Sequence, residues 1–243
     1  MIIFPMAGLS RRFAENGYDL PKYMLPLWGG FVFDFAVASF ESEFQRQPFL
    51  FIYRETGGVR DFLESRVKAL GIAYPRFAVL DKPTAGQAET VELGLKVAEV
   101  PDETPLAIFN IDTFRNPQAS PFPLPEKLSG WLEVFRGEGS NWSFVSPSQT
   151  EYGIAKETAE KVAISDLCST GFYYFSSASM FYRALAKERE KPNASELYIA
   201  PIYNHLISDG GRVGYGLLKQ HDLLLCGVPD EYEALLMSEY PWA

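Results

Sequence analysis

The sequence predicts an α/β fold with a mixed, largely parallel β-sheet flanked by helices and a small β-rich lobe. Three observations lead to this prediction. Strand-like and helix-like segments alternate through the first 112 residues, and the strand-like runs are almost entirely apolar, as in sheets covered on both faces. After Asp112 the pattern changes to short strands separated by turns. Hydrophobic residues make up 47% of the 243-residue chain, which is enough for a large core.

In the first half, apolar and β-branched runs predict strands, and apolar residues at helical spacing predict helices between them. The predicted strands are 2–4, 49–53, 76–80 and 106–111, and the predicted helices are 31–44, 59–70 and 87–97.

The second half begins with a loop over residues 116–125, which contains four prolines. Short strands are expected at 131–135, 143–145, 154–156 and 171–175, helices at 178–190 and 197–208, late strands at 213–218 and 223–226, and a last helix that starts at Pro229. No linker separates the alternating first part of the chain from the part with short strands and turns. We therefore expect a single domain over residues 1–243, built of two halves, 1–112 and 113–243.

Composition excludes several functions. The net charge of −9 disfavours binding to long nucleic acids, which requires a basic surface. No CxxC or HExxH spacing occurs, so a zinc site is not expected. Cys168 and Cys226 are predicted to be buried thiols, although a disulfide between them stays open. The first residues form a strand-like run without a signal peptide or a membrane span, so we expect a cytoplasmic protein.

The strongest functional signal directly follows the first strand, where Pro5-Met6-Ala7-Gly8-Leu9-Ser10-Arg11-Arg12 is followed by Pro21-Lys22. Small residues at this point let a backbone loop approach a ligand, and its N–H groups can bind phosphate oxygens. Three cations gather there in an otherwise acidic protein, which suits phosphoryl chemistry. A turn with solvated surface cations is the alternative. The segment is neither a Walker A loop nor a GxGxxG fingerprint.

These residues resemble the signature of the sugar-phosphate nucleotidyltransferase (sugar-nucleotide pyrophosphorylase) superfamily, and within it the capsule- and polysaccharide-associated branch. Gly8, Arg12, Pro21 and Lys22 occupy the signature positions, whereas Ser10 stands where a second glycine is usual. The resemblance implies a GT-A-like (Rossmann-like) fold. It also implies that residues Ala7 to Arg11 bind the nucleotide and that Arg12 and Lys22 act in catalysis.

Later segments follow the same order as in the family. Thr84-Ala85-Gly86-Gln87 resembles the segment that reads the base, with Gln87 as the base-contacting residue. Its amide can both donate and accept, which suits uracil or thymine. Asp112 ends an apolar strand, where α/β sheets bind ligands, and resembles the carboxylate that holds Mg²⁺. Without the resemblance, Gln87 would be an ordinary polar residue at the start of a helix, and Asp112 a loop cap.

The resemblance also extends to the acceptor-binding half. It implies that Tyr152, Gly153 and Thr170 line the acceptor pocket, that Glu160 accepts hydrogen bonds from hydroxyls and that Lys161 holds the acceptor's phosphate. By residue type alone, Glu160 and Lys161 would be a solvated pair.

One family landmark is missing. Leu225 stands two residues before Gly227, where a second metal-binding aspartate is usual. Asp222 lies three residues upstream, and residues three apart in a strand point to opposite faces, so Asp222 is not expected to replace it.

The implied function is transfer of a nucleotidyl group from a triphosphate, with UTP or dTTP favoured and CTP open, to a sugar 1-phosphate or a related acceptor. Pyrophosphate would leave, and the product would serve surface polysaccharide synthesis. Two alternatives stay open. The first is a GT-A-fold glycosyltransferase, although no Asp-x-Asp pair occurs at Asp112-Thr113-Phe114. The second is a non-catalytic nucleotide-sugar-binding or regulatory homologue, which Leu225 favours. No membrane partner is expected, and a homo-oligomer is left open.

Overall fold

A nine-stranded mixed sheet organises the chain in the computed structural model, which describes residues 1–190 and 196–242. The central path of the sheet has the order β10-β9-β11-β6-β1-β4-β5, and β8 and β12 continue from β11. Strands β5, β4, β1 and β6 are mutually parallel, whereas β11 is antiparallel to β6. The predicted fold class, with a largely parallel central sheet flanked by helices, is therefore confirmed.

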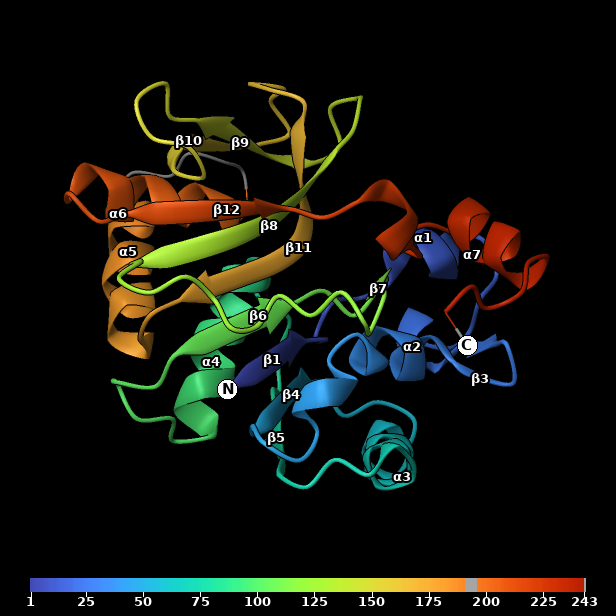
Figure 1. Cartoon of the computed structure of the whole chain (residues 1–243). Helices are drawn as coiled ribbons and strands as arrows, with labels where there is room; N and C mark the ends of the chain where they lie inside the picture. The colour runs from blue at the N-terminus through green and yellow to red at the C-terminus, as the bar shows by residue number, and fades with distance from the viewer. Residues whose placement is uncertain (191–195, 243) are drawn as a thin grey trace.

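The first half supplies the parallel strands and the helices that connect them (Figure 1). Its elements are β1 (Ile2–Pro5), α1 (Arg11–Glu15), η1 (Lys22–Met24), β2 (Pro26–Leu27), β3 (Gly30–Phe31), α2 (Val32–Ala38), η2 (Glu41–Glu43), β4 (Phe49–Tyr53), α3 (Val59–Leu70), β5 (Pro75–Val79), α4 (Gln87–Val97) and β6 (Leu106–Phe109).

The second half adds mostly antiparallel strands and three α-helices. Its elements are β7 (Thr113–Arg115), β8 (Gly130–Arg136), β9 (Ser143–Pro147), β10 (Ala155–Glu160), β11 (Leu167–Phe175), α5 (Ala178–Glu190), η3 (Ala200–Ile202), α6 (Tyr203–Ser208), β12 (Val213–Leu217), η4 (Gln220–Asp222), β13 (Leu223–Leu225) and α7 (Pro229–Leu236).

Most of the predicted elements are confirmed, and two predicted helices are wrong in extent. The helix predicted for 31–44 breaks after Ala38 and resumes as a short 3₁₀ turn. The helix predicted for 197–208 starts later, because the backbone at Leu197 bonds to the segment before α4 instead. Strand β7 was not foreseen, since three residues are too few to show a period.

Alternation along the strands divides the core between the two faces of the sheet. Ile3, on one face, belongs to the hydrophobic cluster that includes α4, α5 and α6. Ile2 and Phe4, on the other face, belong to the cluster that includes α2, α3 and α7. Side chains of a strand point alternately to opposite faces, so both faces are apolar and both are covered. Cys168 and Cys226 are buried free thiols, as predicted.

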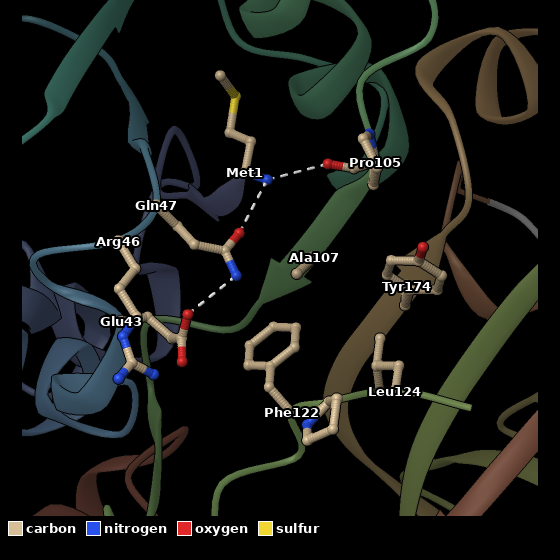
Figure 2. Close-up of a pocket in the computed structure, with 10 residues that line it drawn as sticks. Met1, Glu43, Arg46, Gln47, Pro105, Ala107, Phe122, Leu124 and Tyr174 are labelled. Atoms are coloured by element: carbon tan, nitrogen blue, oxygen red, sulfur yellow. Dashed lines mark hydrogen bonds between the residues drawn. The ribbon is translucent and has the colours of Figure 1, made fainter. Parts of the chain in front are cut away.

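At the carboxyl end of β1, α1 lies beside α7, although the two helices are more than 200 residues apart in sequence (Figure 1). The rings of Phe13 and Tyr232 join them, with centroids 6.2 Å apart. The opposite, amino end of β1 opens into a cavity of about 550 Å³ whose lining includes Met1, Glu43 and Tyr174 (Figure 2). That cavity contains none of the site residues predicted from the sequence.

No helix in the described part of the chain is long and apolar enough to cross a membrane.

Candidate active site

Two adjoining cavities lie where the carboxyl ends of β1 and β6 meet the second half of the chain. The smaller has a volume of about 260 Å³ and the larger about 550 Å³. Five residues line both of them, namely Gln87, Asn110, Asp112, Glu196 and Tyr198. The two spaces therefore form one continuous site, at the edge of the sheet where α/β folds bind ligands.

The loop after β1 borders the smaller cavity with its backbone. Ser10 adopts the left-handed conformation with φ of 48°, which explains why glycine suits this position, and its hydroxyl accepts a hydrogen bond from the Lys22 N–H at 3.3 Å. Within the described residues, the N–H groups of residues 7–12 donate no hydrogen bond. A run of open N–H groups beside a cavity is an anion-binding arrangement.

The predicted loop residues separate into groups. Gly8 and Ser10 line the smaller cavity, and Arg12 lines the larger one. Ala7 and Leu9 face a third cavity of about 270 Å³, to which Gly8 and Ser10 also contribute. Arg11 is exposed and lines none of these three cavities. The structure therefore brings Arg12, but not Arg11, to the site.

Lys22 and Asp112 form an ion pair in the centre of the site. Lys22 Nζ lies 2.5 Å from Asp112 Oδ2, and each side chain is about one-fifth exposed. The Asp112 backbone is fixed from the far end of the chain, because its carbonyl accepts a hydrogen bond from the Cys226 N–H at 2.8 Å. Strands β7 and β13, which pair antiparallel directly beside it, hold this connection in register.

The position of the missing aspartate is part of the site, and Asp222 is not. Leu225 lines the larger cavity. Asp222 belongs to a 3₁₀ turn, is 8% exposed, lines neither cavity and accepts a hydrogen bond from Asn116 Nδ2 at 2.8 Å. The sequence did not point to Glu231, a third carboxylate in this region. Its Oε2 caps α7 by accepting from the N–H groups of Gly227 and Val228.

The donor set limits how a magnesium ion would bind. No group of three or more His, Cys, Asp or Glu side chains in the described residues is arranged to hold a metal ion. Two carboxylates, Asp112 and Glu196, line both cavities, and Asp112 Oδ2 accepts a hydrogen bond from Lys22 Nζ. These residues fit Mg²⁺ that is held mainly by triphosphate oxygens and water, which Mg²⁺ tolerates well.

Gln87 lies at the boundary between the two cavities, as the first residue of α4. Its Nε2 donates to Asn110 Oδ1 at 2.6 Å. Asn110 is in turn packed against Gly171, which has φ of 88°, and a Cβ there would lie 2.4 Å from Asn110 Nδ2. Both the left-handed backbone and the close contact require glycine. Asn110 was not among the predicted site residues, although it lies two residues before Asp112.

Glu160 and Lys161 lie together on the wall of the larger cavity, at the end of β10. The Ser143 hydroxyl donates to Glu160. Burial raises the pKa of Glu160, and the Ser143 hydrogen bond and the Lys161 charge oppose this effect. Lys161 Nζ donates to Tyr198 Oη at 2.6 Å, which raises the pKa of Lys161.

Thr170 also lines the larger cavity and is almost fully buried. Its hydroxyl donates to Glu133 Oε2 at 3.1 Å, and Glu133 forms a buried ion pair with Arg115 at 2.7 Å. The register of β11 shifts between Ser169 and Tyr173 at this point, so the ion pair supports an irregular piece of strand beneath the cavity.

Tyr152 and Gly153 are not brought to the site, contrary to expectation. The Tyr152 side chain is 99% exposed, and neither residue lines the two cavities. The turn that contains them packs against β12 instead, where the Gly153 carbonyl accepts a hydrogen bond from the Tyr215 N–H at 2.9 Å.

The larger cavity contains several residues that the sequence did not single out as site residues, namely Asn110, Asn141, Trp142, Ser143, Ser169, Tyr173, Glu196, Tyr198 and Glu231.

Comparison with solved structures identifies the class of protein. The chain is similar to the nucleoside-diphosphate-sugar pyrophosphorylase from Vibrio cholerae RC9, with 42% identity, a TM-score of 0.91, and coverage of 98% of this chain and 100% of that one. The chain therefore belongs to the nucleoside-diphosphate-sugar pyrophosphorylases, a family of nucleotidyltransferases.

Two more distant structures share the fold. The inositol-1-phosphate CTP transferase from T. maritima has 15% identity and a TM-score of 0.75, with 96% of this chain and 93% of that chain covered. An apo UDP-glucose pyrophosphorylase has 18% identity and a TM-score of 0.72, with 97% and 96% covered. No protein-family model matches the chain, and the search of curated proteins found no match.

Proposed function

We propose that this protein joins a nucleoside monophosphate, taken from a triphosphate, to a sugar 1-phosphate or a similar phosphorylated acceptor. An oxygen of the acceptor's phosphate attacks the α-phosphorus, the bond from that phosphorus to the oxygen bridging to the β-phosphorus breaks, and pyrophosphate leaves. This reaction needs no covalent enzyme intermediate, so positioning and charge stabilisation are sufficient.

One observation carries the proposal. The cavity beside the open N–H groups of the loop, with Lys22, is continuous with the cavity that contains Glu160 and Lys161, and Asp112 lies in both. A triphosphate bound in the first cavity and a phosphorylated acceptor bound in the second would meet at Asp112. The two substrates of a nucleotidyl transfer need such an arrangement.

Each residue then has a chemical task. Lys22 neutralises charge at the α-phosphate, and Arg12 stabilises the leaving pyrophosphate. Asp112 contributes a ligand to Mg²⁺, which would offset the charge of the triphosphate when it is bound. Glu160 accepts hydrogen bonds from acceptor hydroxyls, and Lys161 holds the acceptor's phosphate.

The base is proposed to be uracil or thymine. Gln87 Nε2 donates to Asn110, and within the described residues the Gln87 Oε1 atom accepts no hydrogen bond, so it is open to a donor. The imide N–H of uracil or thymine supplies such a donor, whereas the corresponding ring nitrogen of cytosine is an acceptor. Among the pyrimidine nucleotides, UTP and dTTP are therefore favoured over CTP.

A pyrophosphate-release screen tests the function. Four nucleoside triphosphates and dTTP would each be mixed with sugar 1-phosphates and phosphorylated polyols, with Mg²⁺ present. Release that requires both substrates supports the proposal. Hydrolysis or transfer of a sugar from a nucleotide sugar, without pyrophosphate, would indicate a glycosyltransferase. Tight binding of nucleotide without release in any pair would favour the non-catalytic alternative that Leu225 raises.

The biological role is a further part of the proposal. The resemblance of the loop and of the later motifs to the capsule-associated branch supports a role in supplying activated sugars for surface polysaccharide. Loss of a surface polysaccharide in a strain that lacks this protein, restored by the parent sequence but not by an Asp112→Asn variant, is the expected result.

A further inference from the structure

A short segment, Glu196–Tyr198, lies between the two cavities and contacts both sides of the site. Glu196 and Tyr198 line the smaller cavity as well as the larger one. The segment directly precedes the turn of η3 and, unlike the sequence-based expectation, is not helical. We call this segment, Glu196–Tyr198, the bridge.

On the nucleotide side the bridge is bonded to residues just before α4 and in its first turn. The Leu197 carbonyl accepts from the Ala88 N–H at 2.8 Å, and the Leu197 N–H donates to the Ala85 carbonyl at 3.1 Å. Gly86 lies directly against it, because a Cβ on Gly86 would be 2.6 Å from the Leu197 carbonyl oxygen. The position of the bridge is therefore fixed by the same few residues that position Gln87.

On the acceptor side the bridge holds Lys161. The Tyr198 hydroxyl accepts a hydrogen bond from Lys161 Nζ at 2.6 Å, and this nitrogen lies 4.7 Å from the centroid of the Tyr198 ring. Lys161 itself has φ of 56°, a conformation that a lysine adopts only when its surroundings require it. An ammonium group has three donors, so the bond to Tyr198 leaves two for phosphate oxygens.

We propose that Tyr198 is a positioning residue for Lys161, and that the bridge Glu196–Tyr198 couples acceptor binding to the loop that receives the base. Tyr198 orients the Lys161 ammonium group toward the larger cavity. The backbone bonds of Leu197 link the position of Tyr198 to that of the Ala85–Ala88 segment. This inference rests on the proposed function, in which Lys161 holds the acceptor's phosphate.

Kinetics of two Tyr198 variants test the positioning role. Tyr198→Phe removes the hydroxyl and keeps the ring, and Tyr198→Leu removes both. Loss of a hydrogen bond to a charged group is expected to raise the KM for the acceptor about tenfold in Tyr198→Phe, and further in Tyr198→Leu. The KM for the triphosphate and kcat should change less than about twofold, because Tyr198 acts only through Lys161.

Tyr182→Phe provides the matched control. Its ring also lies near a lysine, with Lys96 Nζ 6.0 Å from its centroid, but it lines a separate cavity. This variant should leave all three constants unchanged. A Tyr198→Phe enzyme with an unchanged acceptor KM, in a parent that turns over, would overturn the inference. A parent with no turnover on any substrate pair would count against the proposed function instead.

A substitution on the nucleotide side tests the coupling. Gly86→Ala places a Cβ against the Leu197 carbonyl, so the bridge must shift. We expect the acceptor KM to rise together with the triphosphate KM, although Gly86 lines neither cavity. If only the triphosphate KM rises, and circular dichroism and thermal unfolding show the variant to be folded, the two sites are not coupled through this bridge.

Discussion

The ammonium group of Lys22 lies 2.5 Å from the carboxylate of Asp112, although 90 residues separate them in sequence. The two groups come from the segment after α1 and from the end of β6, and each neutralises the other. In the proposed function, a bound triphosphate would offer Lys22 a second anionic partner and would offer Asp112 a magnesium ion. We therefore propose that the ion pair separates when the triphosphate binds.

The basic side chains at the loop should be required for turnover. Arg12→Ala and Lys22→Ala are each expected to lower kcat about 100-fold or more, because removal of a group that stabilises developing charge has an effect of this order. Stopped-time pyrophosphate assays at saturating substrate measure it. Arg60→Ala serves as the control, since Arg60 is exposed on α3 and pairs with Glu64. Near-normal turnover in either loop variant would remove that residue from the mechanism.

The two aspartates should differ sharply. Asp112→Asn is expected to lose turnover at least about 100-fold, since it removes the only carboxylate in the described residues that Lys22 contacts. Asp222→Asn should change turnover less than about twofold, because an amide oxygen can still accept from Asn116. A large loss in Asp222→Asn, or a contact from Asp222 to a metal in a nucleotide complex, would contradict this assignment.

Base preference should depend on the Gln87 side chain. UTP or dTTP is expected to be used best by the parent, as judged from kcat/KM in competition with CTP, ATP and GTP. Gln87→Leu removes both the acceptor and the donor to Asn110, so discrimination among pyrimidines should fall about tenfold. A purine as the best donor for the parent would show that Gln87 does not read the base in the way proposed.

Glu160 is expected to lower stability at neutral pH. Burial, the largest effect, raises its pKa from the ordinary value of 4.5, and Glu196 acts in the same direction. A raised carboxyl pKa means that stability is lost as the pH rises from about that value through the folded-state pKa. The change in stability caused by Glu160→Gln should therefore be more favourable at pH 7 than at pH 4. The same substitution should weaken acceptor binding.

The measurement is the difference in Tm between Glu160→Gln and the parent at the two pH values. Glu157→Gln, on an exposed position of the same strand, should show little difference between them. Equal Tm differences for Glu160→Gln at both pH values would mean that the carboxyl group carries no net penalty.

Sequence patterns were most informative where a local rule applies. The helices Val59–Leu70, Gln87–Val97 and Ala178–Glu190 were predicted to the residue, because their apolar periodicity and end signals are contained within one segment. Arg12, Lys22, Asp112 and Gln87, which were predicted because they stand beside predicted strands and helices in a recognised order, all line one or both of the two cavities.

Residues that reach the site from loops were harder to find. Glu196 and Tyr198 are held at the site by long-range backbone hydrogen bonds of Leu197. Such bonds cannot be predicted from a local sequence pattern. Tyr152 was predicted from a motif alone, and its turn instead packs on β12, which is more than 60 residues away in sequence. Motif order thus identified the segments, but only tertiary packing decided which side chains face the cavity.

Strand β11 has a consequence for how the chain folds. One of its edges bonds to β6 of the first half through four aligned residue pairs from Phe172 to Phe175, and to β9 at Cys168, whereas the other edge bonds to β8. Neither half can therefore complete its sheet without this strand. We expect fragments divided at Asp112 to be insoluble separately and to regain structure only when mixed, and the intact chain to melt in one cooperative step.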